Sequence, residues 1–149
     1  MAITQAMCTS FKKALLDGEM DFSTNTAQSY NIALIKSGSS GTFGAATTSY
    51  TDLTGSSDEV TGTGYTAGGN LLGISTVPTT SGTTAFLSFN TTTWGTATIT
   101  AAGALLYNSS ASNKAIAVFS FGSNVASTAG DFTVIFPTAD ASNAVIRIT

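Results

Sequence analysis

The fold class is decided by residues 83–108, which read TTAFLSFNTTTWGTATITAAGALLYN. In the middle of this stretch, apolar Ala97, Ile99 and Ala101 alternate with threonines. A period of two residues predicts β-strands with one buried and one exposed face. We expect three strands here, over residues 83–89, 92–101 and 103–108.

Strand-like segments continue on both sides of this stretch. Residues 114–121 are apolar on both faces, which is typical of a central strand that is covered twice. Pro78 to Gly82 is predicted to be a turn. Further strands are expected over residues 30–36, 70–77, 131–136 and 144–148. Because no helical period separates the strands, the sequence predicts an all-β, antiparallel, jelly-roll-like sandwich of about eight strands.

One amphipathic helix is expected ahead of the strands, over residues 4–16. Thr4 is its predicted N-cap, and Gly18 is expected to end it in the left-handed conformation. One apolar stripe with a spacing of four residues runs along it, formed by Ile3, Met7, Phe11 and Leu15. We therefore divide the chain into an N-terminal helix and arm, residues 1–29, and a β-sandwich domain, residues 30–149.

Composition excludes several classes of partner. The chain has 149 residues, a net charge of −3 and only five scattered Lys and Arg residues. Nucleic-acid binding is not expected, because it depends on a concentration of positive charge. The sequence has no run of roughly 18 apolar residues, so no membrane span is expected, and no secretory leader is expected either. Cys8 is the only cysteine and is expected to act as a small apolar residue.

The sequence contains few residues that could carry out catalysis. Histidine is absent, which removes the commonest general base and zinc ligand. Asp17, Glu19 and Asp21 have the spacing with which a calcium loop begins, but Phe22 and Gln28 replace the required Gly and Glu. We therefore expect no catalytic residue, no metal and no cofactor, and we do not expect an enzyme.

Trp94 is the only tryptophan, and three roles are open to it. It is a core side chain at the entry of a strand, an anchor in a protein interface, or a platform for a sugar. Together with Met7, Phe11 and Leu15, it is a candidate protein-contact residue.

Three stretches of the sequence, residues 1–18, 59–69 and 130–147, carry a resemblance to a known group of proteins. They read MAITQAMCTSFKKALLDG, EVTGTGYTAGG and GDFTVIFPTADASNAVIR. The chain resembles the small head decoration, or cement, proteins of tailed bacteriophages. This resemblance implies a structural virion protein, made in the host cytoplasm, that binds the major capsid protein on the outer capsid surface as a homo-oligomer, with a trimer favoured. It supplies no ligand-binding or catalytic residue to transfer.

Two alternatives are kept beside this interpretation: a tail, neck or fibre-associated virion component, and a sugar-binding jelly-roll module for host attachment. The N-terminal helix also has two interpretations. Either residues 1–30 help to dock the protein on its partner, or Met7, Phe11 and Leu15 cover an open end of the sandwich.

Overall fold

The chain folds into two antiparallel β-sheets with two short helices, as described for residues 2–149 by a computed structural model. In chain order, the elements are β1 (Ala6–Met7), α1 (Thr9–Leu16), β2 (Tyr30–Lys36), α2 (Tyr50–Gly55), β3 (Asn70–Leu72), β4 (Ile74–Ser81), β5 (Thr84–Phe89), β6 (Thr92–Asn108), β7 (Lys114–Val134) and β8 (Ile146–Ile148). The larger sheet has the order β1-β7-β6-β2-β3 and the smaller has the order β4-β5-β8. The prediction of an antiparallel, mostly β fold with about eight strands is confirmed.

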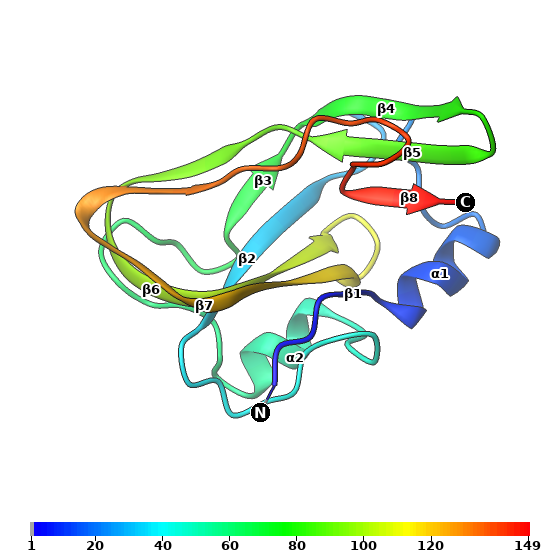
Figure 1. Ribbon diagram of the computed structural model, residues 1–149. Coiled ribbons are helices and arrows are strands. Elements are labelled where there is room, and N and C mark those ends of the chain that lie inside the picture. Colours follow the sequence, from blue (N-terminus) through cyan, green and yellow to red (C-terminus); the bar gives the residue numbers. More distant parts are fainter. Residues whose placement is uncertain (1) are drawn as a thin grey trace.

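A long hairpin of β6 and β7 connects the two layers (Figure 1). Near its turn, the hairpin lies inside the larger sheet, where β2 pairs with β6 and β1 pairs with β7. Beyond that part, β6 and β7 pair with each other, apart from a single bridge between Thr98 and Thr63, and curve toward the layer of β4 and β5. Four register shifts interrupt the ladder, and such bulges bend and twist a strand pair.

This hairpin consists of fewer and longer strands than its sequence pattern predicts. The segments expected at residues 92–101 and 103–108 are one strand, β6, and those expected at residues 114–121 and 131–136 are joined in β7, which ends at Val134. Gly103 is part of the ladder: a Cβ there would lie 2.5 Å from the Phe119 carbonyl oxygen. The polar middle of β7 was missed because it has no buried face, although its backbone still pairs with β6.

Two further corrections concern β3 and β4. The single strand expected over residues 70–77 is divided at Gly73, so that its halves belong to different sheets. The turn expected over residues 78–82 is wrong, because β4 continues through Pro78 to Ser81. Proline fits there because β4 is an outer strand, and its register shifts between Thr76 and Thr79.

The N-terminal segment packs into the same core as the sheets. The helix begins later than expected, with Cys8 as N-cap in place of Thr4, because residues 6–7 are extended and pair with β7. Gly18 follows the helix at φ 73°, as predicted, and its N–H bonds to the Leu15 carbonyl oxygen. Phe11 is fully buried, meets Phe22 edge-on, and belongs with it to the hydrophobic cluster that contains the buried residues of the sheets.

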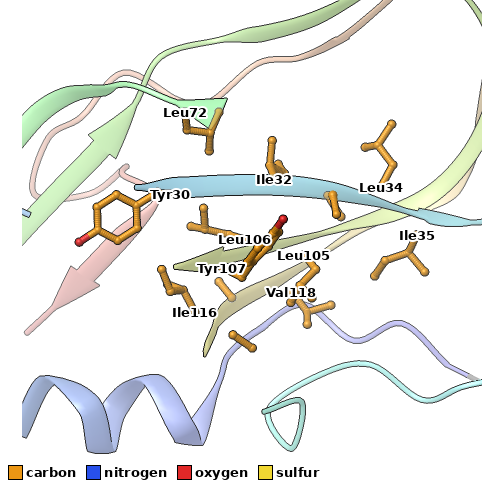
Figure 2. Packing of buried hydrophobic residues seen from close by; sticks show 14 of the residues in the cluster. Tyr30, Ile32, Leu34, Ile35, Leu72, Leu105, Leu106, Tyr107, Ile116 and Val118 are labelled. Atoms are coloured by element: carbon orange, nitrogen blue, oxygen red, sulfur yellow. The ribbon is translucent and has the colours of Figure 1, made fainter. Parts of the chain in front are cut away.

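The core is centred on β2, which carries apolar side chains on both of its faces (Figure 2). In that view, Leu34 and Ile35 point to opposite sides of the strand. Aromatic rings then join the layers. Tyr30 on β2 stacks on Phe22 with centroids 4.6 Å apart and lies 5.8 Å from Phe89 of β5. Burial of this apolar surface on both sides makes β2 the centre of the sandwich.

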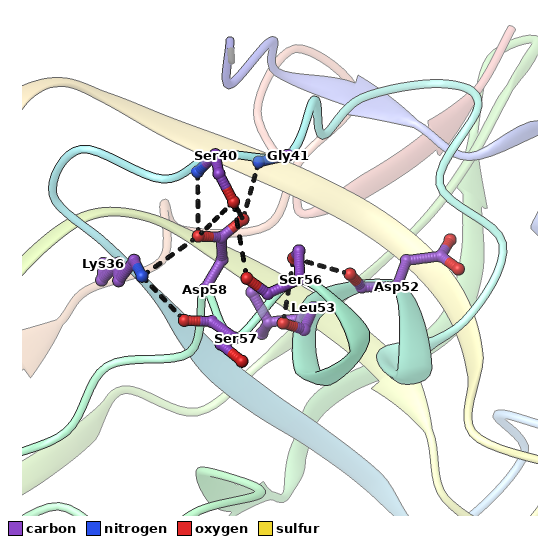
Figure 3. Close-up of polar contacts among 8 residues, drawn as sticks. All are labelled: Lys36, Ser40, Gly41, Asp52, Leu53, Ser56, Ser57 and Asp58. Carbon is purple, nitrogen blue, oxygen red and sulfur yellow. Dashed lines mark hydrogen bonds and ion pairs between the residues drawn. The ribbon is translucent and has the colours of Figure 1, made fainter.

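A buried aspartate ties the connection between β2 and β3 to the sheet (Figure 3). The Asp58 side chain is fully buried and accepts hydrogen bonds from the backbone N–H groups of Ser40 (2.9 Å) and Gly41 (2.7 Å). Lys36 Nζ lies 3.3 Å from its carboxylate. Burial alone raises the pKa of the Asp58 carboxyl, but these donors outweigh burial and hold the pKa well below its usual range.

We predict that Asp58→Asn lowers the free energy of unfolding by about 2–3 kcal/mol at pH 7, because the amide turns an N–H group toward existing donors. In the unfolded chain the pKa of this carboxyl is near 4. Because folding lowers that pKa, the carboxylate stabilises the fold at pH values above about 4, and this contribution is lost as the pH falls. In urea unfolding, the difference in free energy of unfolding between the wild type and Asp58→Asn is expected to become about 1 kcal/mol smaller between pH 5 and pH 3. The exposed Asp131→Asn serves as control; a difference that does not change with pH would contradict this account.

A second prediction concerns Gly69, which precedes β3 at φ +72°. A Cβ there would lie 1.8 Å from the Ile32 carbonyl oxygen. Gly69→Ala should therefore cost more than about 3 kcal/mol of stability or prevent folding. Gly82→Ala, at φ +58° with open space around it, should cost only about 1 kcal/mol in the same denaturation experiment. Equal losses would show that the close approach at Gly69 is unimportant.

Candidate protein-contact surface

The carboxylates of Asp58, which is buried, and Glu59, which is half-buried, are both used by the fold. Glu59 accepts hydrogen bonds from the Tyr50 hydroxyl (2.5 Å), the Tyr65 hydroxyl (2.7 Å) and the Gly68 backbone N–H (2.7 Å). Its neighbour Asp58 belongs to the separate network of Figure 3. The two carboxylates do not converge on a common point, and among residues 2–149 no group of His, Cys, Asp and Glu is arranged to hold a metal ion.

The Cys8 thiol is also built into the interior. It is buried at the start of α1, and its Sγ lies 3.6 Å from the Gly44 carbonyl oxygen, to which it donates. Burial, with a smaller contribution from Asp52, raises the pKa of the thiol to about 12. Because the thiolate is the nucleophile, Cys8 is inert in the folded chain.

An apolar hollow lies between α1 and β8. These two elements lie near the C-terminus in Figure 1. We call the hollow the α1/β8 groove. Its volume is about 510 Å³, and it is lined by Met7, Lys12, Leu15, Leu16, Arg147 and Ile148. Leu16 is 90% exposed and Ile148 is 52% exposed. Large aliphatic side chains held in water around a concave surface are typical of protein contacts.

A second hollow continues this groove between the layers. It has a volume of about 300 Å³, shares Met7 and Arg147 with the first, and extends along Ala117–Phe119 of β7 and residues 144–146. Its walls include β1 and β8, the outer strands of the two sheets on this side of the sandwich. The combined surface therefore exposes aliphatic side chains beside two outer strands.

The structure separates the four candidate contact residues into two pairs. Met7 and Leu15 are half-buried and line the groove, Met7 from β1 and Leu15 from the last turn of α1. Phe11 and Trp94 are buried within the chain, so neither can contact a partner in this conformation. For Phe11, the interpretation as a side chain that covers the sandwich is supported by its contact with Phe22.

Trp94 is a core side chain, as one of the three interpretations held. It is 3% exposed, stacks on Tyr65 at 5.8 Å and meets Phe132 edge-on at 6.1 Å. Its Nε1 has no hydrogen-bond partner among residues 2–149. A buried indole offers no exposed face for a sugar ring.

Sequence reasoning missed the most exposed members of the groove, Leu16 and Ile148. Leu16 lies one residue beyond the apolar stripe and faces away from the core, and Ile148 belongs to the terminal strand. A large aliphatic residue directly before the helix stop was the one available signal for Leu16. Nothing in the sequence indicated that α1 and β8 lie side by side.

We predict that Cys8 in the folded protein does not react with a thiol reagent such as DTNB at pH 8, since a pKa of about 12 leaves almost no thiolate. Labelling in guanidinium chloride should be complete, because unfolding restores an ordinary thiol. Rapid stoichiometric labelling of the folded chain, at the rate seen after unfolding, would contradict the assigned burial.

Comparison with family models, curated protein sequences and solved structures gave no match to this chain. Within residues 2–149, neither helix has the length and apolar character that crossing a bilayer requires.

Proposed function

We propose that this chain is a structural virion protein that binds the outer surface of a tailed-bacteriophage capsid and stabilises it by bridging neighbouring capsid subunits. Its partner is the major capsid protein, and it acts as a homo-oligomer, with a trimer favoured. It is made in the host cytoplasm and has no enzymatic role. The proposal includes a jelly-roll-like description of the sandwich, since the two sheets are joined by connections of unequal length.

The structural observation that carries the proposal is the α1/β8 groove. Its aliphatic side chains, led by Leu16, are held by elements that pack into the core, so the surface is preformed. A preformed apolar surface loses little entropy on binding. Many copies around a shell then add their contacts, so each interface can be modest. The resemblance of residues 1–18, 59–69 and 130–147 supplies the identity of the partner.

The alternatives differ in what they now have to support them. A sugar-binding role depended on Trp94 as an open platform, and that side chain is buried. A tail, neck or fibre-associated role uses the same kind of protein contact as a shell role. Copy number separates these two, because shell positions outnumber tail positions many times over.

Quantitative mass spectrometry of purified particles tests the proposed location. We expect on the order of hundreds of copies of the chain per particle, in a fixed ratio to the major capsid protein. Particles assembled without the chain should be intact but lose their DNA at a lower temperature, because bridging contacts are missing. A handful of copies per particle would instead place the chain in the tail or neck.

A further inference from the structure

We propose that the α1/β8 groove binds an extended segment of the partner protein that carries carboxylates beside aliphatic side chains. This inference rests on the proposed function and adds the chemistry of the docking segment to it. Three observations support it: the charge of the groove, its apolar lining and the strand edges beside it.

The first observation is the positive charge that lines this groove. Three of the five cations of the chain form ion pairs inside it: Lys13 with Asp17, Lys36 with Asp58, and Lys114 with Glu19. Lys12 and Arg147 have no ion pair among residues 2–149, and both line the α1/β8 groove. In a chain with a net charge of −3, the two unpaired cations therefore meet in one place.

The Asp140 carboxylate, on which the Arg147 charge acts, is occupied by its own turn. Arg147 donates to the Ala141 carbonyl oxygen at 2.6 Å. Asp140 accepts from the backbone N–H groups of Ser142 and Asn143, both at 2.7 Å, so its carboxylate closes its own turn. These backbone hydrogen bonds, with a smaller contribution from the Arg147 charge, lower the pKa of the Asp140 carboxyl, but Arg147 and Asp140 form no ion pair. An acidic side chain from outside would therefore meet two exposed cations, Lys12 and Arg147, that have no direct carboxylate contact among residues 2–149.

The second observation is the apolar lining between these cations. Leu16 and Ile148 project into solvent, and Met7 and Leu15 form half-buried walls. A purely acidic ligand would leave these aliphatic groups in water, and a purely apolar ligand would bury two cations without partners. A segment that combines both chemistries satisfies the whole surface.

The third observation concerns the backbone. β8 and β1 are outer strands, and the second hollow between them continues the groove through Met7 and Arg147. Outer strands present unpaired N–H and C=O groups that accept an added strand. An extended occupant can use these groups, with alternate side chains directed at the apolar lining and at the cations.

A peptide titration tests the chemistry independently of any virion. The probes are a short synthetic peptide of alternating Asp and Val, and its counterpart with Asn in place of Asp. In heteronuclear NMR spectra of the ¹⁵N-labelled full chain, we expect the acidic peptide to shift the amides of Met7, Leu16 and Ile148. The Asn peptide should bind at least about tenfold more weakly. Equal binding of both peptides, or shifts confined to another surface, would overturn the proposal.

Matched variants sharpen this titration. Lys12→Gln should weaken binding of the acidic peptide several-fold, whereas Lys13→Gln, which removes the same charge from the next position, should not. Leu16→Ser should weaken it, whereas Ile135→Ser, at a residue 77% exposed and outside the groove, should not. Equal effects within either pair would mean that general charge or hydrophobicity, and not the groove, drives binding. Each variant is first shown to unfold at the wild-type temperature.

Binding to shells that lack the chain separates the two proposals. If the wild-type chain does not bind such shells, the proposed function fails, whatever the peptide titration shows. If the wild-type chain binds and the double variant Lys12→Glu, Arg147→Glu binds equally well, the groove proposal fails while the function stands. We expect the double variant to lose at least about tenfold in occupancy. If the free chain self-associates and this double variant abolishes the self-association, the groove binds a second copy of the chain. That result would overturn the proposal that the groove binds a segment of the partner protein.

Discussion

The pairing of β6 with β7 is the interaction on which the rest of this structure depends. These strands form the centre of the larger sheet, flanked by β2 on one side and β1 on the other. Their far end turns toward the smaller sheet, where β6 follows β5 after two residues (Figure 1). α1 packs on β7, so the groove at the end of that helix also takes its position from the hairpin. Loss of this ladder would remove the support of both layers.

Sequence patterns predicted the fold class because alternation reports which face of a strand is buried. These patterns failed where the backbone of a strand is paired but its side chains are not buried. The middle of β7 pairs on its backbone while its side chains remain in water, so it carries no alternation. Gly103 resembles a break in the sequence but serves a close approach of two strands. Met7 fits the apolar stripe expected for the helix, but residues 6–7 are extended. A helical period and a strand period both place Met7 toward the core, so the sequence does not distinguish the two.

The candidate site was only half predictable for a related reason. Met7 and Leu15 belong to a stripe that can be read from the sequence, and both reach the groove. Lys12 and Arg147 lie at opposite ends of the chain, and nothing in the sequence shows that they share a surface. The acidic residues that the sequence places side by side, Asp58 and Glu59, lie outside the groove. Asp58 and Glu59 direct their carboxylates inward, where they hold loops in place. These two carboxylates thus serve the stability of the fold, whereas the groove exposes the cations Lys12 and Arg147 beside aliphatic side chains.

We propose that the chain works by docking the α1/β8 groove on a capsid shell. A cryo-electron microscopy map of the particle that contains the chain, at a resolution that shows side chains, tests this claim most directly. We expect density for the two-sheet fold on the outer surface of the shell, with Leu16 and Ile148 in contact with an extended, acidic segment of a capsid subunit. Density for the chain in the tail, or on the shell with this groove open to solvent, would contradict it.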